Sequence, residues 1–303
     1  MTNAWRCAGL RWTDRAPVLV WLRDGGGRRE SALVYGSDVA FRALGARQCA
    51  GARGNACPRR ATVPGRGTGG QCAECARLDR LHSVAADTIA DDPRTYRVYL
   101  AWFGPGLVKV GITAEERGDA RLLGQGAVVF SWLGRGPLMA ARRTEELLRT
   151  ALGVPDRIPY ARKRAVRSAL PAREERADEV GRMHARAVAL SDWPQSLERL
   201  DFSPVDHAEP FGLDGLAPLM GVVTELVDGG AFAGRLVAAA GPDLHLATVG
   251  SGASGTGGGE DGAVIVLDTR LMSGWELVRA EADAGVTLPV RDTHSGGVQD
   301  GLF

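Results

Sequence analysis

The chain has 303 residues, of which 45% are hydrophobic and 24% are charged. This composition is typical of a soluble globular protein of about two domains, and it excludes a collagen-like, mucin-like or wholly disordered chain. The longest apolar run near the start, residues 18–22, is far shorter than the roughly 20 residues of a membrane span. No secretory signal is recognisable either, so we expect a cytoplasmic protein without membrane contact.

The net charge of +1 conceals a strong asymmetry along the chain. Residues 1–176 carry 30 basic and 17 acidic side chains, whereas residues 177–303 carry 7 and 19. A basic half indicates an anionic partner such as nucleic acid, although attraction between two surfaces of one protein or simple drift explains the same pattern. Only two of the basic residues are lysines, which indicates a GC-rich genome, so a single arginine is weak evidence of function.

The first 95 residues are expected to form an N-terminal unit of β-strands and a zinc site. Alternating apolar and polar residues predict strands over 5–12, 18–22 and 30–34, with a turn at Asp24-Gly25-Gly26-Gly27. A loop rich in glycine and arginine follows over 45–70, and a short helix over 73–82.

Residues 96–172 show the clearest pattern and predict a small α+β domain. Two strands over 97–103 and 107–112 form a hairpin. The expected elements after them are a helix over 115–123, a strand over 127–133 and helices over 138–152 and 160–172. Residues 173–303 are expected to form a helical linker and a C-terminal β domain, a small sheet or barrel. Its predicted elements are a helix over 173–190, a loop over 202–216 and short strands over 222–227, 233–239, 245–249, 264–267 and 275–278.

Four of the five cysteines follow the pattern C-x7-C-x14-C-x2-C, and they are Cys49, Cys57, Cys72 and Cys75. A Cys-x-x-Cys pair places two thiolates on one metal ion, and a second pair completes a tetrahedron. The surrounding loop has too few apolar residues for a core of its own, so a structural Zn²⁺ would supply the missing folding energy.

The first cysteine spacing is wider than the usual two to four residues, and this leaves alternatives open. Cys7 and His82 are candidate substitute ligands, although Cys7 lies on a predicted strand and is better explained as a small buried hydrophobic residue. A redox pair of Cys72 and Cys75, with two incidental thiols, is the other alternative.

The segment over 97–172 resembles the GIY-YIG nuclease superfamily. Arg97-Val98-Tyr99 corresponds to its first motif and Lys109-Val110-Gly111 to its second, while Arg121 and Glu145 correspond to the arginine and the metal-binding glutamate of the following helices. The chain also resembles an uncharacterised bacterial family of unknown function, in which a cysteine cluster precedes a segment of the form VYLA…KVGIT…QGA. The name of that family states no activity, so this resemblance supports the fold more than a function.

The nuclease resemblance implies a role for each of four residues. Tyr99 would act as a base or orient water, Arg121 would bind the phosphate, and Glu145 would hold Mg²⁺ or Mn²⁺. Lys109 stands where the superfamily has a second tyrosine. Three interpretations follow: Lys109 assists phosphate binding, it acts as a base, or its presence means that the catalytic activity has been lost. The structural alternative is a core tyrosine, a solvated arginine and a glutamate paired with a neighbouring arginine.

Two weaker motifs are present in the chain. Residues 250–255 match G-x-G-x-x-G, and Asp268 follows, but the glycine-rich residues 256–262 cannot supply the helix of a dinucleotide site, so a hairpin loop is expected. The basic residues over 157–167 follow a phosphate backbone or form a solvated helix face.

The leading hypothesis is therefore a metal-dependent phosphodiester hydrolase, an endonuclease-like enzyme acting on nucleic acid. One alternative is a non-catalytic, zinc-stabilised protein that binds nucleic acid or has a regulatory role. The other is a GIY-YIG-like fold recruited to small-molecule chemistry.

Overall fold

The computed structural model describes residues 5–23, 26–81, 92–248 and 263–293. The chain forms two compact units, one made of Met1–Ser83 with Ala217–Phe303 and the other of Val84–Leu216. Both units mix helices and strands, which confirms the expected α+β class. Several predictions fall wholly or partly outside the described residues. They are His82 as a ligand, the turn that starts at Asp24, the last residues of the helix over 73–82 and of the strand over 245–249, and the glycine-rich residues 250–262.

The first unit is built on one ten-stranded sheet in the order β15-β10-β13-β12-β11-β4-β14-β1-β2-β3. Its strands are β1 (Trp5–Thr13), β2 (Ala16–Arg23), β3 (Gly27–Ala32), β4 (Asp38–Leu44), β10 (Leu219–Val223), β11 (Ala231–Ala240), β12 (Asp243–Ala247), β13 (Val264–Asp268), β14 (Glu276–Arg279) and β15 (Val290–Asp292). The helices of this unit are α1 (Ala73–Leu81) and α7 (Thr269–Met272). Among the paired strands, only β10 and β13 run parallel in the described part of the sheet.

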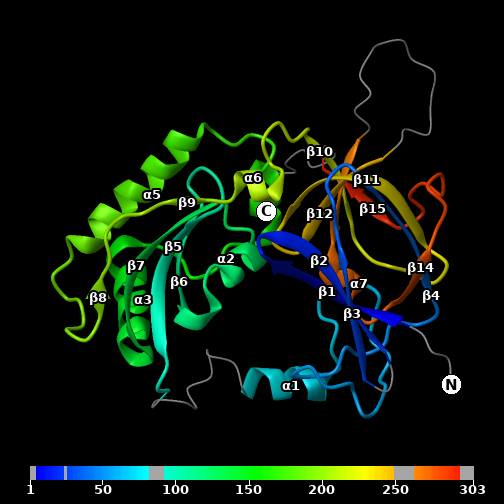
Figure 1. Ribbon diagram of the computed structural model, residues 1–303, viewed down its shortest axis with the longest axis horizontal. Helices are drawn as coiled ribbons and strands as arrows, with labels where there is room; N and C mark the ends of the chain where they lie inside the picture. The colour runs from blue at the N-terminus through cyan, green and yellow to red at the C-terminus, as the bar shows by residue number, and fades with distance from the viewer. Residues whose placement is uncertain (1–4, 24–25, 82–91, 249–262, 294–303) are drawn as a thin grey trace, which may run out of the picture. The chain divides into compact units, whose positions relative to one another are not determined.

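This sheet joins segments that the local sequence patterns assign to separate N-terminal and C-terminal parts. β4 pairs with both β11 and β14, and β14 also pairs with β1 (Figure 1). The partners are about 200 residues or more apart in sequence, and local periodicity carries no information on pairing over that separation. The strand at β4 is itself absent from the predicted elements.

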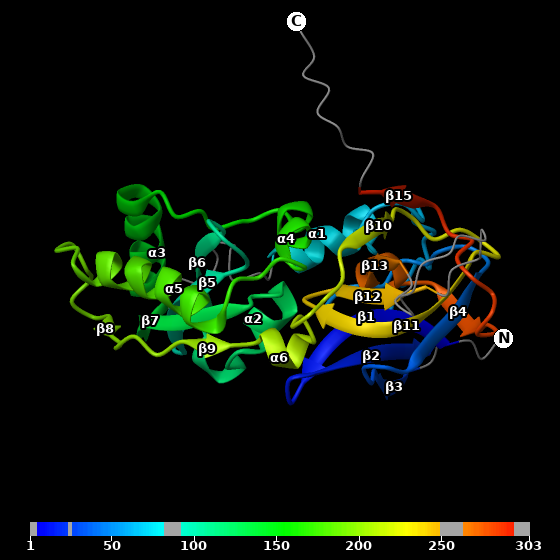
Figure 2. The same cartoon turned by 90° about the horizontal axis from the view of Figure 1, so that it is seen from above.

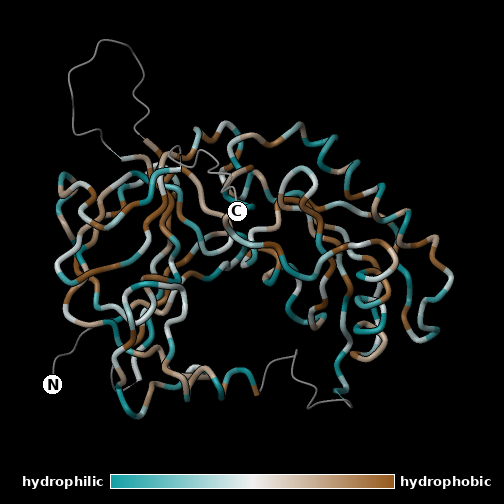
Figure 3. Tube along the Cα trace, turned by 180° about the vertical axis from the view of Figure 1, so that it is seen from behind, coloured by the Kyte–Doolittle hydropathy of each residue, from teal (hydrophilic) through white to brown (hydrophobic). Residues whose placement is uncertain are grey.

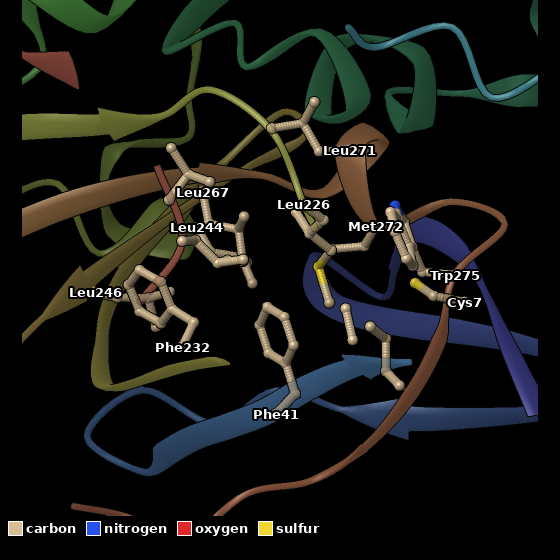
Figure 4. Packing of buried hydrophobic residues seen from close by; sticks show 14 of the residues in the cluster. Cys7, Phe41, Leu226, Phe232, Leu244, Leu246, Leu267, Leu271, Met272 and Trp275 are labelled. Carbon is tan, nitrogen blue, oxygen red and sulfur yellow. The ribbon is translucent and has the colours of Figure 1, made fainter. Parts of the chain in front are cut away.

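Apolar side chains from both chain segments share the core of the sheet. Phe41 of β4 stacks on Phe232 of β11 with 6.3 Å between the ring centroids (Figure 4). Cys7 lies in the same core, where burial raises the pKa of its thiol to about 12. Cys7 is therefore a buried small residue, as expected, and belongs to this core rather than to the cysteine cluster.

The second unit is built on a smaller antiparallel sheet in the order β6-β5-β7-β8, with β9 also paired to β7. Its strands are β5 (Thr95–Trp102), β6 (Val108–Ala114), β7 (Val129–Pro137), β8 (Glu198–Arg199) and β9 (Val205–Asp206). Its helices are η1 (Glu115–Arg117), α2 (Ala120–Gln125), α3 (Leu138–Leu152), α4 (Tyr160–Val166), α5 (Arg173–Val188) and α6 (Ala208–Phe211). Both α3 and α5 pack on the sheet (Figure 2).

The helices of this unit differ from the predictions in four places, one of which is the short helix α6 within the loop expected over 202–216. The helix expected over 115–123 divides into η1 and α2 at Gly118, whose φ of 49° is unfavourable for a helix. The basic helix α4 ends at Val166, before the expected residue 172. Helix α5 belongs to this unit instead of linking it to another domain, and Figure 3 shows polar residues along it while the strands are largely apolar. No helix in the described ranges is long and apolar enough to cross a membrane.

Candidate functional site

The four clustered cysteines come together in the first unit, at the loop that precedes α1. Cys49 and Cys57 lie on the loop, Cys72 lies just before α1, and Cys75 lies in its first turn. The four Sγ atoms all lie within 4.8 Å of one another, and those of Cys57 and Cys72 are 4.0 Å apart. Tetrahedral zinc with Zn–S bonds of about 2.3 Å requires sulfurs about 3.8 Å apart, so the cluster can hold one metal ion and its ligand set favours zinc.

Backbone amides surround the sulfurs and support the thiolate form. The amides of Gly51 and Cys72 donate to the Sγ of Cys49 over 3.4 and 3.1 Å. A backbone hydrogen bond from Ala61 is the largest cause that lowers the pKa of Cys57, to about 7. Burial instead raises the pKa values of Cys49 and Cys75. A divalent cation bound among these sulfurs would offset the cost of ionising the buried thiols, because its charge favours the thiolate form.

Two features of the chain fix the loop that carries Cys49 and Cys57. Gly51 has a φ of 79°, and a Cβ there would lie 1.8 Å from the carbonyl oxygen of Asn55, so only glycine fits. Arg47 is buried and donates to four carbonyl oxygens, which lie 2.7–2.9 Å away on Pro64, Gly67, Arg270 and Ser273. It therefore joins the cysteine loop to the segment around α7, a role that the sequence pattern does not reveal.

A second group of predicted residues meets on the hairpin of the other unit. Tyr99 on β5 is fully buried, and its hydroxyl accepts a hydrogen bond from Nε2 of Gln125 at 3.1 Å. Lys109 on β6 is 7% exposed, and its Nζ lies 5.8 Å from the centroid of the Tyr99 ring. The same Nζ donates to the backbone carbonyl of Asp156 at 3.0 Å.

Glu145 on α3 is half-buried within a group of charged side chains. Burial raises the pKa of this carboxyl, and the nearby Lys109 opposes the shift. The carboxylate of Asp156 raises the pKa further, while Arg121 and Arg142 lower it. The structure thus brings Lys109, Arg121 and Glu145 within electrostatic reach of one another, with Tyr99 buried beside Lys109.

Asp156 and Gln125 have no role in the sequence hypotheses, and Lys163 appears there only as one of the basic residues over 157–167. Asp156 follows α3 across a turn, and nothing in its local pattern distinguishes it. Gln125 belongs to the QGA segment, which points to this residue without giving it a role. Lys163 is buried and donates to the backbone carbonyl of Gln125 at 3.0 Å, and its Nζ lies 3.8 Å from the centroid of the Phe103 ring. Lys163 therefore does not lie on a solvated face, which was one of the two alternatives for the basic residues over 157–167.

A cavity of about 380 Å³ opens elsewhere in the same unit, at the start of α5. Arg173 and Arg176 line it, and the buried Arg176 pairs with Asp206 at 3.1 Å and with Asp214 at 3.7 Å. None of the four predicted catalytic residues lines this cavity.

The fold and the cysteine cluster define a mixed α+β protein with a site that can hold a metal ion. The model of a family described as "Protein of unknown function (DUF2797)" matches residues 36–277. The match covers well over half of the chain, so the chain belongs to this family, and the expected membership of an uncharacterised family is confirmed. No curated protein and no solved structure matches the chain, and the comparisons give no support to the GIY-YIG resemblance.

Proposed function

We propose that the protein is a zinc-stabilised phosphodiesterase that cleaves nucleic acid with Mg²⁺ or Mn²⁺, in the manner of the GIY-YIG nucleases. One observation carries the proposal: the half-buried Glu145 lies among the cations Lys109 and Arg121 and a second carboxylate, Asp156. The succession of a hairpin, a helix with Arg121, a strand and a helix with Glu145 agrees with the superfamily pattern.

The charges of this group match the needs of phosphodiester cleavage. The like charge of Asp156 is one cause that raises the pKa of Glu145, and a divalent cation near both carboxylates would offset it. That cation supplies a Lewis acid for the phosphate group. Arg121 is exposed on α2, so its guanidinium is available to bind a phosphate oxygen. Lys109 adds a fixed positive charge at the same place.

The burial of Tyr99 favours a positioning role over a direct role in proton transfer. Its hydroxyl holds Gln125, and its ring lies beside the Nζ of Lys109. A side chain with no exposed surface does not reach an attacking water unless the structure opens.

The same observations favour a second candidate function, binding of nucleic acid without cleavage. Lys109 replaces the expected second tyrosine, and its Nζ is already engaged by the carbonyl of Asp156. Cations around a phosphate are sufficient for binding, whereas hydrolysis also needs an accessible group that accepts a proton.

Incubation of the purified, zinc-loaded protein with single- and double-stranded DNA and RNA tests the proposal. We expect cleavage with Mg²⁺ or Mn²⁺ that Glu145→Gln abolishes, and Glu146→Gln is the matched control because Glu146 is the next residue and pairs with Arg149 at the surface. Arg121→Ala is expected to lower turnover about a hundredfold or more.

The outcomes separate the two candidates. One outcome is that the wild type fails to cleave yet binds nucleic acid at low salt, with binding that Arg121→Ala weakens. That result would favour binding without cleavage as the function. Cleavage that appears only in Lys109→Tyr would show that this one position disables the site. Absence of both binding and cleavage would contradict both candidates.

A further inference from the structure

Tryptophan and arginine side chains alternate at the end of the ten-stranded sheet. Trp5, Trp21, Arg23 and Arg29 form this group, which we call the Trp–Arg stack. Trp5 lies opposite Arg23 and Trp21 lies opposite Arg29 in the strand register, so each pair shares a face of the sheet. The Arg29 guanidinium lies 4.6 Å from the ring centroid of Trp5 and 5.3 Å from that of Trp21, and the Arg23 guanidinium lies 5.3 Å from that of Trp5.

The stack belongs to three neighbouring strands, of which β3 is the last of the sheet (Figure 2). Arg29 is exposed, and Trp5 and Arg23 are partly exposed. Trp21 is also partly exposed, and the rest of its side chain packs against the core of the sheet. The indole N–H of Trp21 donates to the hydroxyl of Ser31 at 3.0 Å, which holds this ring in place. The group therefore presents aromatic and guanidinium surface to solvent in an ordered arrangement.

Neither arginine of the stack has an acidic partner among the described residues. Their neighbour Arg28, in contrast, forms an ion pair with Glu30 on the same strand. The N–H groups of Arg23 and Arg29 therefore remain available for an external anion, while contact with the indole rings limits the freedom of both side chains. An arginine held in this way loses little conformational entropy when it binds.

We propose that the Trp–Arg stack binds single-stranded nucleic acid. Guanidinium groups bind phosphate oxygens, and indole and guanidinium faces stack on unpaired bases, which is the combination that single-strand binding requires. A duplex hides the faces of its bases, and an acidic peptide offers carboxylates but no planar rings, so both use only part of this surface. The inference goes beyond the proposed function, because the stack lies in the other compact unit from Glu145 and needs no cleavage.

Fluorescence anisotropy of a labelled oligothymidylate with the full-length protein tests the inference, without added divalent metal. We expect Arg29→Ala and Trp5→Leu each to weaken binding about tenfold, the value of one base–aromatic contact. Arg29→Lys keeps the charge but loses the planar group, so it is expected to remain weaker than the wild type. Arg11→Ala is the matched control, because Arg11 is exposed on β1 and precedes Trp12, which packs on the core side of the strand.

Two results would overturn the inference once circular dichroism and zinc content show that the variants are folded. The first is an equal loss of oligonucleotide affinity in Arg29→Ala and Arg11→Ala, which would show that only the net charge of the protein matters. The second is competition by polyglutamate or duplex DNA as effective as that by the single strand. Loss of cleavage by Glu145→Gln with unchanged binding would leave the inference intact, so the two proposals fail separately.

Discussion

Tyr99 and Gly111 face each other across the β5–β6 hairpin, and the side chain of one occupies the space that a side chain on the other would need. The two residues are register partners, and a Cβ on Gly111 would lie 2.4 Å from the Tyr99 hydroxyl oxygen. The glycine of the Lys109-Val110-Gly111 motif therefore allows Tyr99 to lie flat against β6 and to reach Gln125. The two motifs of the hairpin act as one packing unit.

Gly111→Ala is expected to destabilise the protein by about 1–3 kcal/mol, as overpacking of a filled core commonly does. The displaced Tyr99 would also lose its hydrogen bond with Gln125. Gly124→Ala is the matched control, because Gly124 lies in α2 and a Cβ added there would meet no atom within 4 Å. Thermal unfolding should show a lower Tm for the first variant and an equal or higher Tm for the second. An equally stable Gly111→Ala would contradict the packing argument.

Arg47→Ala is expected to cost about 3 kcal/mol in unfolding free energy, because it removes four hydrogen bonds from a buried guanidinium to backbone carbonyl oxygens. Arg47→Lys keeps the charge but lacks the planar set of N–H donors, so it should restore only part of the stability. Denaturant unfolding measures both, and Arg59→Ala, which removes an exposed ion pair with Glu74, should change stability by less than about 0.5 kcal/mol. Full stability in Arg47→Lys would show that charge alone suffices.

The purified protein is expected to contain one zinc ion per chain, and Cys72→Ala should lower both the zinc content and the Tm. Three remaining thiolates form a weaker site, and the cysteine loop depends on the metal for its stability. Cys7→Ala is the control, since this buried cysteine lies in the core of the sheet and should leave one zinc per chain. Elemental analysis decides, and zinc content that falls in Cys7→Ala but not in Cys72→Ala would contradict the ligand assignment.

Glu145→Gln is expected to stabilise the protein at neutral pH. Because burial raises the pKa of Glu145, the folded state binds this proton more tightly than the unfolded state, and stability falls as the pH rises above the ordinary carboxylate value of about 4.3. The variant lacks this loss, so its Tm advantage should increase between about pH 4 and pH 7.

Glu146→Gln should behave in the opposite sense, because the hydrogen bond with Arg149 lowers the pKa of Glu146 and its ionised form is favoured by folding. That contribution is present above the ordinary carboxylate pKa and is lost as the pH falls, so this variant gains nothing at neutral pH. Thermal unfolding across pH compares the two. A pH-independent difference for Glu145→Gln would show that its ionisation is not linked to folding, and added Mg²⁺ should reduce the advantage if the cation binds there.

Local sequence patterns were sufficient for most of the secondary structure of the second unit. The apolar spacing over 138–152 gives α3 with the same bounds, and the glycine-proline turn places β5 and β6 as a hairpin. The same patterns did not reveal β4 of the first unit, in which Asp38 and Arg42 interrupt the apolar residues without a regular alternation, or the short strands β8 and β9. Strands of two residues exist only through their pairing with β7.

Cysteine spacing predicts which four sulfurs meet, because that pattern acts over a short stretch of the chain. The roles of Tyr99, Lys109, Arg121 and Glu145 stay predictions. Packing of the folded chain joins β1 and β4 to strands at the other end of the chain, lets Arg47 hold the cysteine loop to the segment around α7, and brings Asp156 near Glu145. The strand pairs join groups far apart in sequence, Arg47 contacts backbone carbonyls that every residue carries, and Asp156 comes near Glu145 through the segment that follows α3. Such contacts leave no periodicity or motif, and the packing of the whole unit selects them.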